Sequence, residues 1–179
     1  MKLETDIKTI ERLAEMNQDA DWEFRKYLKG VDLPSEEIDA VVHRLYKTVS
    51  EQIDCRKCGN CCKTIGPLLK EKDIEHLSAH LKLTQEAFAR EYLGQDEDGD
   101  GQSFKAMPCP FLADNSCTVY DARPEDCRSF PHLHKDGFVF RLMSVVSNCS
   151  VCPIVNNVYA QLKGEVKALK KWKSIDENI

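Results

Sequence analysis

Apolar residues recur at helical spacing over several long stretches of the chain. The clearest pattern begins at Pro34-Ser35-Glu36-Glu37, which is typical of a helix start because acids complement the positive end of the helix dipole. Residues 3–30 show the same period, with a polar run at Asn17–Asp21 that divides them and Gly30 as a stop. The apolar stripe that follows Pro34 predicts a core-facing helix and consists of Ile38, Val41, Val42, Leu45, Tyr46, Val49 and Ile53.

Helical spacing returns over residues 74–81, and Thr84 is suited to cap a helix over Gln85–Leu93 that Gly94 ends. Because proline is favoured in the first turn of a helix, a short helix over Pro124–Arg128 is also predicted. A last helix is predicted from Pro153 to about Lys173.

Two segments between these helices have a different pattern. Cys55–Pro67 is a loop by composition, since it contains glycine and asparagine and lacks a helical stripe. The apolar run Phe138–Val146 follows the turn signal Asp136-Gly137 and predicts one or two short strands.

These elements predict an α-rich α+β fold in which helices from both termini pack around a cysteine-rich irregular region with a small β-hairpin. We expect residues 1–179 to form a single domain. Its expected parts are a helical N-terminal part (1–53), a cysteine-cluster metal-binding core (54–155) and a C-terminal helix (156–179).

The composition is that of a globular protein, with 42% hydrophobic and 31% charged residues in a chain of 179. A formal net charge of −5 argues against a broad nucleic-acid surface. No apolar stretch has the length of a transmembrane helix, and the first residues carry acids where a secretory signal would be apolar. We therefore expect a cytoplasmic protein without nucleic-acid or membrane partners.

The chain has nine cysteines, and all of them lie within one central stretch of the sequence. This clustering indicates a specific chemical role. An odd number of cysteines in a cytoplasmic protein argues against a disulfide framework and favours metal binding or thiol chemistry. The candidate metal ligands are Cys55, Cys58, Cys61, Cys62, Cys109, Cys117, Cys127, Cys149 and Cys152.

The run Cys55-x-x-Cys58-x-x-Cys61-Cys62 carries the strongest signal. A two-residue gap lets the chain turn back so that two sulfurs reach one metal, and Gly59 and Asn60 suit that turn since both tolerate positive φ. Adjacent cysteines would be strained on one tetrahedral ion, so one of Cys61 and Cys62 ligates while the other serves a second metal, a supporting role or redox chemistry. Three cysteines at successive two-residue gaps also resemble the start of a bacterial ferredoxin motif, in which a later cysteine precedes proline as Cys109 and Cys152 do here.

Three motifs in the same order resemble the YkgJ-like cysteine-cluster family, whose members are described as zinc- or iron-chelating. The first is the CxxCxxCC run, the second is Cys109-Pro-Phe-Leu, and the third runs from Cys117 through Tyr120, Arg123 and Cys127 to Pro131. The resemblance covers roughly residues 50–155. It implies a metal-chelating domain with an iron–sulfur cluster or iron, and zinc is the alternative cofactor.

Three functions stay open at this point. The first is a redox or metal-handling protein that holds an iron–sulfur cluster or iron. The second is a structural zinc module that acts as a binding or scaffold protein for a partner the sequence does not identify. The third is a metal-dependent enzyme that modifies another protein.

The two arginines of the third motif allow two interpretations. Arg123 and Arg128 can balance the negative charge of a cluster or donate hydrogen bonds to a thiolate. Alternatively, they pair locally with carboxylates among Asp121, Glu125 and Asp126. His132 and His134 are further candidate auxiliary ligands because they follow Cys127 closely.

Overall fold

The computed structural model describes residues 2–95 and 101–176 and divides the chain into two compact units. The first, called here the helical unit, combines Met1–Asp54 with Pro131–Ile179. The second, the cysteine unit, is Cys55–Phe130. The predicted α-rich α+β class is confirmed, since helices dominate and two small antiparallel sheets accompany them. That residues 1–179 behave as one domain stays a prediction.

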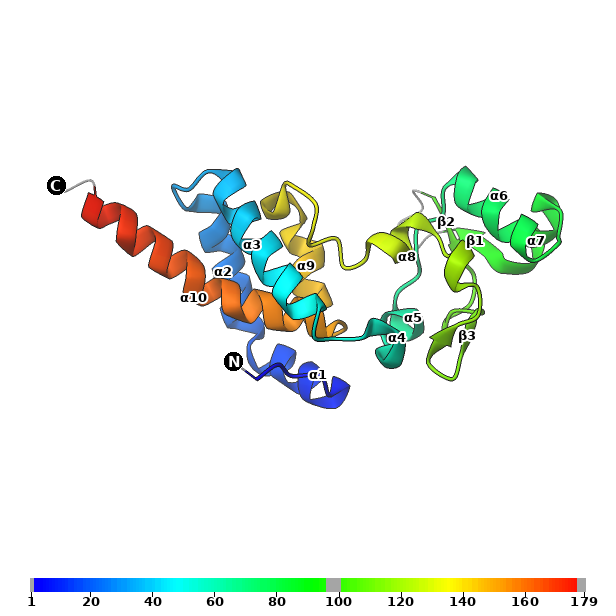
Figure 1. The fold of residues 1–179 in the computed structure, drawn as a ribbon, viewed down its shortest axis with the longest axis horizontal. Coiled ribbons are helices and arrows are strands. Elements are labelled where there is room, and N and C mark those ends of the chain that lie inside the picture. Colours follow the sequence, from blue (N-terminus) through cyan, green and yellow to red (C-terminus); the bar gives the residue numbers. More distant parts are fainter. Residues whose placement is uncertain (1, 96–100, 177–179) are drawn as a thin grey trace. The chain divides into compact units, whose positions relative to one another are not determined.

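The helical unit is built around α3 (Figure 1). Of the other elements, α10 has the most extensive contact with this helix. The predicted division of the first helical stretch is confirmed: α1 ends at Met16, and the side chain of Asn17 donates a hydrogen bond to the Leu13 carbonyl at 2.7 Å. The elements of this unit are α1 (Ile7–Met16), α2 (Gln18–Gly30), α3 (Ser35–Ser50), η2 (Phe138–Arg141), α9 (Leu142–Asn148) and α10 (Pro153–Asp176).

The core of the helical unit uses the predicted stripe of α3, of which Ile38, Val42 and Val49 are at most 1% exposed. The opposite side of the core comes from α10, where Tyr159 packs edge-on against Phe24 with ring centroids 5.4 Å apart. Further buried apolar residues of this core are Ile10, Leu28, Val41, Leu45, Val155, Val158, Leu162 and Val166.

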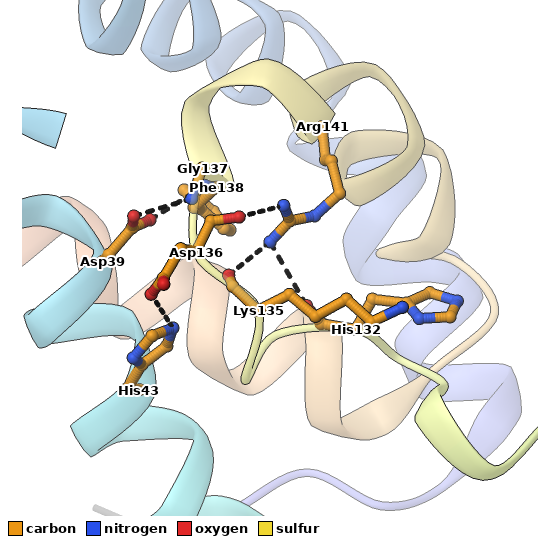
Figure 2. A network of polar contacts seen from close by, with 8 residues as sticks. All are labelled: Asp39, His43, His132, Lys135, Asp136, Gly137, Phe138 and Arg141. Carbon is orange, nitrogen blue, oxygen red and sulfur yellow. Dashed lines mark hydrogen bonds and ion pairs between the residues drawn. The ribbon is translucent and has the colours of Figure 1, made fainter. Parts of the chain in front are cut away.

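The prediction of strands over Phe138–Val146 is wrong, because η2 and α9 occupy this segment. Its buried residues follow the period of a helix rather than the alternation of a strand: Phe138, Leu142, Val145, Val146 and Cys149. A distant side chain fixes where the helical segment starts. The buried carboxylate of Asp39 accepts hydrogen bonds from the backbone N–H groups of Gly137 and Phe138, at 2.7 and 2.8 Å (Figure 2).

The cysteine unit has shorter elements. Thr84 caps α7 as predicted, since its hydroxyl accepts a hydrogen bond from the Ala87 N–H at 3.2 Å, but Gly94 lies inside the following strand instead of ending the helix. The elements of this unit are α4 (Cys55–Cys58), α5 (Cys61–Thr64), α6 (Glu71–His80), α7 (Gln85–Tyr92), β1 (Leu93–Gln95), β2 (Gln102–Phe104), β3 (Leu112–Ala113), β4 (Ser116–Cys117), η1 (Tyr120–Ala122) and α8 (Glu125–Ser129).

Two antiparallel hairpins supply the predicted β component, at positions the sequence pattern did not indicate. In the first, Leu93 of β1 pairs with Phe104 of β2. In the second, Leu112 of β3 pairs with Cys117 of β4 across a two-residue turn in which Asp114 and Asn115 both have positive φ. The small apolar core between these hairpins and α6 and α7 consists of Leu69, Leu77, Phe88, Phe104, Phe111 and Val119.

Over the residues described, none of the helices is both long enough and apolar enough to cross a membrane.

Candidate metal centre

The nine cysteines divide between the two units. The cysteine unit holds Cys55, which is exposed, and six half-buried cysteines; the helical unit holds Cys149 and Cys152, which are buried. All nine lie in the described part of the chain, and none of them forms a disulfide. The six half-buried cysteines are Cys58, Cys61, Cys62, Cys109, Cys117 and Cys127.

The CxxCxxCC run forms two single helical turns, α4 and α5, instead of the predicted loop. Gly59 between them has the expected positive φ, of 60°, whereas Asn60 has ordinary right-handed helical angles. A Cβ at Gly59 would lie 2.9 Å from the Asn115 carbonyl oxygen, which is closer than real Cβ contacts. The missing side chain therefore allows the first two-residue gap to approach the turn of the β3–β4 hairpin.

Backbone hydrogen bonds bring later cysteines to this run. The N–H of Cys109 donates to the Cys62 carbonyl at 2.8 Å, although 46 residues separate the two in the sequence. Backbone hydrogen bonds from Phe111 and Val119 lower the pKa values of Cys109 and Cys117, respectively, against the larger effect of burial. Such bonds from a residue two positions later are the arrangement that stabilises a thiolate next to a metal.

Three thiols, those of Cys109, Cys117 and Cys127, lie within electrostatic range of Cys62. A negative charge on Cys62 contributes to the raised pKa values of Cys109, Cys117 and Cys127, and Cys109 and Cys117 likewise act on Cys127. We call Cys62, Cys109, Cys117 and Cys127 the inner thiols. The sequence predicted the donor type, and the structure groups these four from three separate motifs.

The inner thiols differ in acidity. A hydrogen bond from Cys61, assisted by the charge of Lys63, outweighs burial and lowers the pKa of Cys62 to about 7. Burial raises the pKa of Cys109 to about 11 and that of Cys127 to about 12, and it also raises the pKa of Cys117. At neutral pH the metal-free protein therefore carries one partly ionised inner thiol and three protonated ones.

Two carboxylates position α8, the short helix that carries Cys127: sequence reasoning missed Asp73, and it considered Asp126 only as a partner of the arginines. Asp73, which is 6% exposed, accepts hydrogen bonds from the N–H groups of Glu125 at 2.8 Å and Lys70 at 2.9 Å. Asp126 accepts a hydrogen bond from the Leu68 N–H at 3.1 Å. The only sequence signal for Asp73 is its position in the first turn of α6, where an acid also has a local capping role.

Cations act electrostatically on two of the inner thiols, Cys62 and Cys117. The guanidinium of Arg123 is 3.7 Å from the centroid of the Tyr120 ring, and that of Arg56 is 5.9 Å from the same centroid. The charge of Arg123 lowers the pKa of Cys117, against the larger effect of burial, and Lys63 has a similar effect on Cys62. The predicted ion pairs of Arg123 and Arg128 with neighbouring carboxylates are not found within the described residues; instead, the Arg128 Nε–H donates to the Arg123 carbonyl at 2.9 Å.

Cys149 and Cys152 belong to the core of the helical unit. The Cys149 thiol donates a hydrogen bond to the Val145 carbonyl at 3.4 Å, and burial raises its pKa far above the ordinary value of a thiol. Cys152 precedes Pro153 directly at the start of α10 and is 8% exposed. Metal ligation by these two cysteines stays a prediction.

The two candidate histidines also belong to the helical unit. The His132 carbonyl accepts a hydrogen bond from Arg141, which also binds the carbonyls of Lys135 and Asp136 (Figure 2). The His134 ring lies 6.0 Å from the Tyr46 ring, centroid to centroid. Ligation by either histidine likewise stays a prediction.

Among residues 2–95 and 101–176, no group of three or more His, Cys, Asp or Glu side chains converges closely enough to hold a metal ion. The sulfur atoms of the inner thiols therefore do not surround a common point at which a metal ion would be bound.

Comparison with known proteins identifies a family for the central part of the chain. Residues 54–155 match the family model "CxxCxxCC: Putative zinc- or iron-chelating domain". No curated protein and no solved structure matches the chain.

Proposed function

Because the chain belongs to the CxxCxxCC family, which is described as zinc- or iron-chelating, we propose that the cysteine unit binds a metal through its inner thiols. The observation that carries the proposal is the backbone hydrogen bond that joins Cys109 to Cys62, together with the electrostatic effect of Cys62 on Cys109, Cys117 and Cys127. Four thiolates are a complete ligand set for zinc or for an iron–sulfur cluster. The proposed ligands are Cys62, Cys109, Cys117 and Cys127.

The chemistry of the donor set supports this assignment. Cys109 and Cys117 each receive a backbone N–H, and Cys62 is already partly ionised at neutral pH. Ligation requires thiolates, so the remaining thiols lose their protons as the metal binds. Since the side chains do not yet converge on a common point, binding includes an inward movement of the segments that carry them.

We propose an iron–sulfur cluster, or iron, as the bound group, with a redox or metal-handling role. The cysteine unit has seven cysteines, more than one tetrahedral ion needs. Cys55, Cys58 and Cys61 belong to the same run, and we assign them as further ligands for a cluster or for the exchange of metal. When bound, such a group supplies one-electron transfer or a transferable metal. Reduced thiols are required, and the proposal therefore includes a reducing compartment such as the cytoplasm.

A structural zinc ion is the second candidate, and the size of the core favours it. Among the described residues of the cysteine unit, the apolar core has six buried members, and the strands are two or three residues long. Small units with little core are commonly stabilised by a metal or disulfides, and a zinc ion on the inner thiols would connect the CxxCxxCC run to the β3–β4 hairpin and α8.

One experiment tests the proposal and separates the two candidates. The protein is purified without oxygen, its visible spectrum is recorded, and iron, zinc and acid-labile sulfide are measured per chain. Iron with sulfide and a brown colour supports the cluster, whereas stoichiometric zinc in a colourless protein supports the structural ion. A chain that retains neither metal, and gains none on reconstitution with iron and sulfide or with zinc, contradicts the proposed function.

A further inference from the structure

Arg123 is held at both its backbone and its head group. Its guanidinium stacks on Tyr120 at 3.7 Å, and its carbonyl accepts a hydrogen bond from the Arg128 side chain at 2.9 Å. Tyr120 lies in η1, three residues after Cys117, so these contacts fix the cation beside the strand that carries an inner thiol. A guanidinium stacked in this way is oriented before any ligand arrives.

One polar atom of this side chain is unsatisfied. The Arg123 Nε–H is enclosed and has no hydrogen-bond partner, and no ion pair joins Arg123 to a carboxylate within the described residues. An enclosed donor without an acceptor is unfavourable, so its persistence in a structure calls for an explanation. The carboxylate of Asp126, three residues later, is engaged by the Leu68 N–H.

The anionic group for which Arg123 is suited is a thiolate of the proposed centre. A thiol is a weak acceptor, whereas a metal-bound thiolate is an anionic one. Several thiolates around one metal carry a net negative charge, and a guanidinium supplies a cation that does not lose its proton. Arg123 already acts electrostatically on Cys117.

We propose that Arg123 is a positioning residue of the metal centre, which donates a hydrogen bond from its enclosed Nε–H to the Cys117 thiolate when metal is bound. This inference rests on the proposed function. Arg123 thereby compensates thiolate charge and orients the Cys117 sulfur without touching the metal. Arg56, whose guanidinium lies 5.9 Å from the Tyr120 centroid, is too distant from the ring to share this stacked geometry.

Co²⁺ is the probe, because its visible bands report thiolate ligation directly. Four full-length proteins are compared under anaerobic conditions: the unsubstituted chain, Arg123→Gln, Arg123→Lys and Arg90→Gln. Arg90 lies on α7 of the same unit and is exposed, so its substitution removes the same charge away from the inner thiols. Zn²⁺ affinity is measured on the same samples by competition with a chromophoric chelator, and circular dichroism verifies folding.

We expect Arg123→Gln to weaken Co²⁺ and Zn²⁺ binding by roughly tenfold or more, the usual effect of removing a partner of a metal ligand. Its sulfur-to-cobalt charge-transfer band should move to longer wavelength, because a thiolate that loses a hydrogen bond is a stronger electron donor. Arg123→Lys should recover part of the affinity through its charge, and Arg90→Gln should behave like the unsubstituted chain.

Two results overturn the inference alone: an Arg123→Gln protein with unchanged affinity and spectrum, or an equal loss in Arg90→Gln. If Arg123→Gln fails to fold, Arg123→Lys decides, because full affinity with an unshifted band in that variant rules out a specific role of the guanidinium. If the unsubstituted chain gives no sulfur-to-cobalt band but gains iron and sulfide on reconstitution, the inference alone is likewise overturned. If it gains neither iron with sulfide nor zinc, the proposed function fails and the inference fails with it.

Discussion

The side chain of Asp73 accepts a hydrogen bond from the backbone N–H of Glu125 at 2.8 Å, across 52 positions of sequence. Glu125 is the first residue of α8, and the preceding Pro124 makes no side-chain capping bond there. The other Asp73 oxygen accepts from the Lys70 N–H before α6. One buried carboxylate therefore caps two helices, and the second of them carries Cys127.

Substitution of Asp73 should destabilise the protein and weaken its metal binding. We expect Asp73→Ala to lower the free energy of unfolding by about 2 kcal/mol, because two backbone N–H groups lose their acceptor. Asp73→Asn keeps one acceptor oxygen and should cost less. Urea denaturation followed by circular dichroism measures the change. The control is Glu75→Gln, at an exposed position on the same helix. Its free energy of unfolding should stay within about 0.5 kcal/mol of that of the unsubstituted protein. If the control lost as much stability as Asp73→Ala, Asp73 would have no specific role.

Metal affinity should rise steeply with pH. Cys109 and Cys127, with pKa values of about 11 and 12, are protonated at pH 6–8, and so is Cys117 with its raised pKa. Binding must displace these protons, and each one displaced makes the apparent affinity increase by about tenfold per pH unit. Cys62, with a pKa of about 7, adds to the slope only below that pH.

The proton count can be measured by titration calorimetry with Zn²⁺ in two buffers of different ionisation enthalpy. We expect one proton from each of Cys109, Cys117 and Cys127 at pH 7.5, and additional release from Cys62 at pH 6.5. An affinity that does not change between these two pH values would contradict ligation by the inner thiols.

Gly59→Ala should destabilise the cysteine unit by roughly 1–2 kcal/mol, the cost of a left-handed conformation for an L residue, with a further contribution from the contact to Asn115. Gly164→Ala is the matched substitution, because it lies in α10 where a Cβ meets nothing within 4 Å. That change should stabilise the protein by roughly 0.5–1 kcal/mol. Thermal unfolding compares the two, and a tolerated alanine at position 59 would show that the turn can rearrange.

Single cysteine substitutions should separate the inner thiols from the cysteines of the helical unit. We expect Cys127→Ser to abolish tight binding, because one of four thiolates is lost. Cys152→Ala tests whether the helical unit contributes a ligand, since Cys152 also lies within the matched residues 54–155. Bound metal per chain, measured after gel filtration, gives the answer: retention of metal by Cys127→Ser would contradict the assignment, and loss from Cys152→Ala would add Cys152 to the ligands.

The prediction of a single domain can be tested through the placement of the aromatic residues. Trp22 lies in α2 of the helical unit, so its fluorescence, recorded in a Trp172→Phe protein, reports on that unit. Alkylation of Cys109 and Cys127, quantified by mass spectrometry at each urea concentration, reports on the cysteine unit. If the chain is one cooperative domain, the two transitions coincide. Separate midpoints would show that the units unfold independently.

The sequence pattern predicted long periodic elements well and short ones poorly. The start of α3 after Pro34 and the Thr84 cap of α7 were both found, because local chemistry determines them. Phe138–Val146 was assigned to strands because a short apolar run does not distinguish a strand from a buried helix. The hydrogen bonds from the Gly137 and Phe138 N–H groups to Asp39 favour the helical start at this segment. They depend on a residue nearly a hundred positions away.

For the candidate centre, spacing indicated the donor type and the family but not the grouping. Cys62 and Cys109 meet through a backbone hydrogen bond between distant segments, which no local pattern contains. Asp73 has the sequence context of an ordinary first-turn acid, and only the fold gives it a second helix to cap. Long-range contacts thus decide which of the predicted ligands become neighbours.

The helical unit is discontinuous in the sequence, and this has a consequence for the order of events on the ribosome. Its α3 packs mainly against α10, whose residues are synthesised after those of the cysteine unit. During translation the first three helices therefore remain without their main partner while residues 55–130 emerge complete. The nascent chain therefore exposes the seven cysteines of the cysteine unit before the helical unit can assemble.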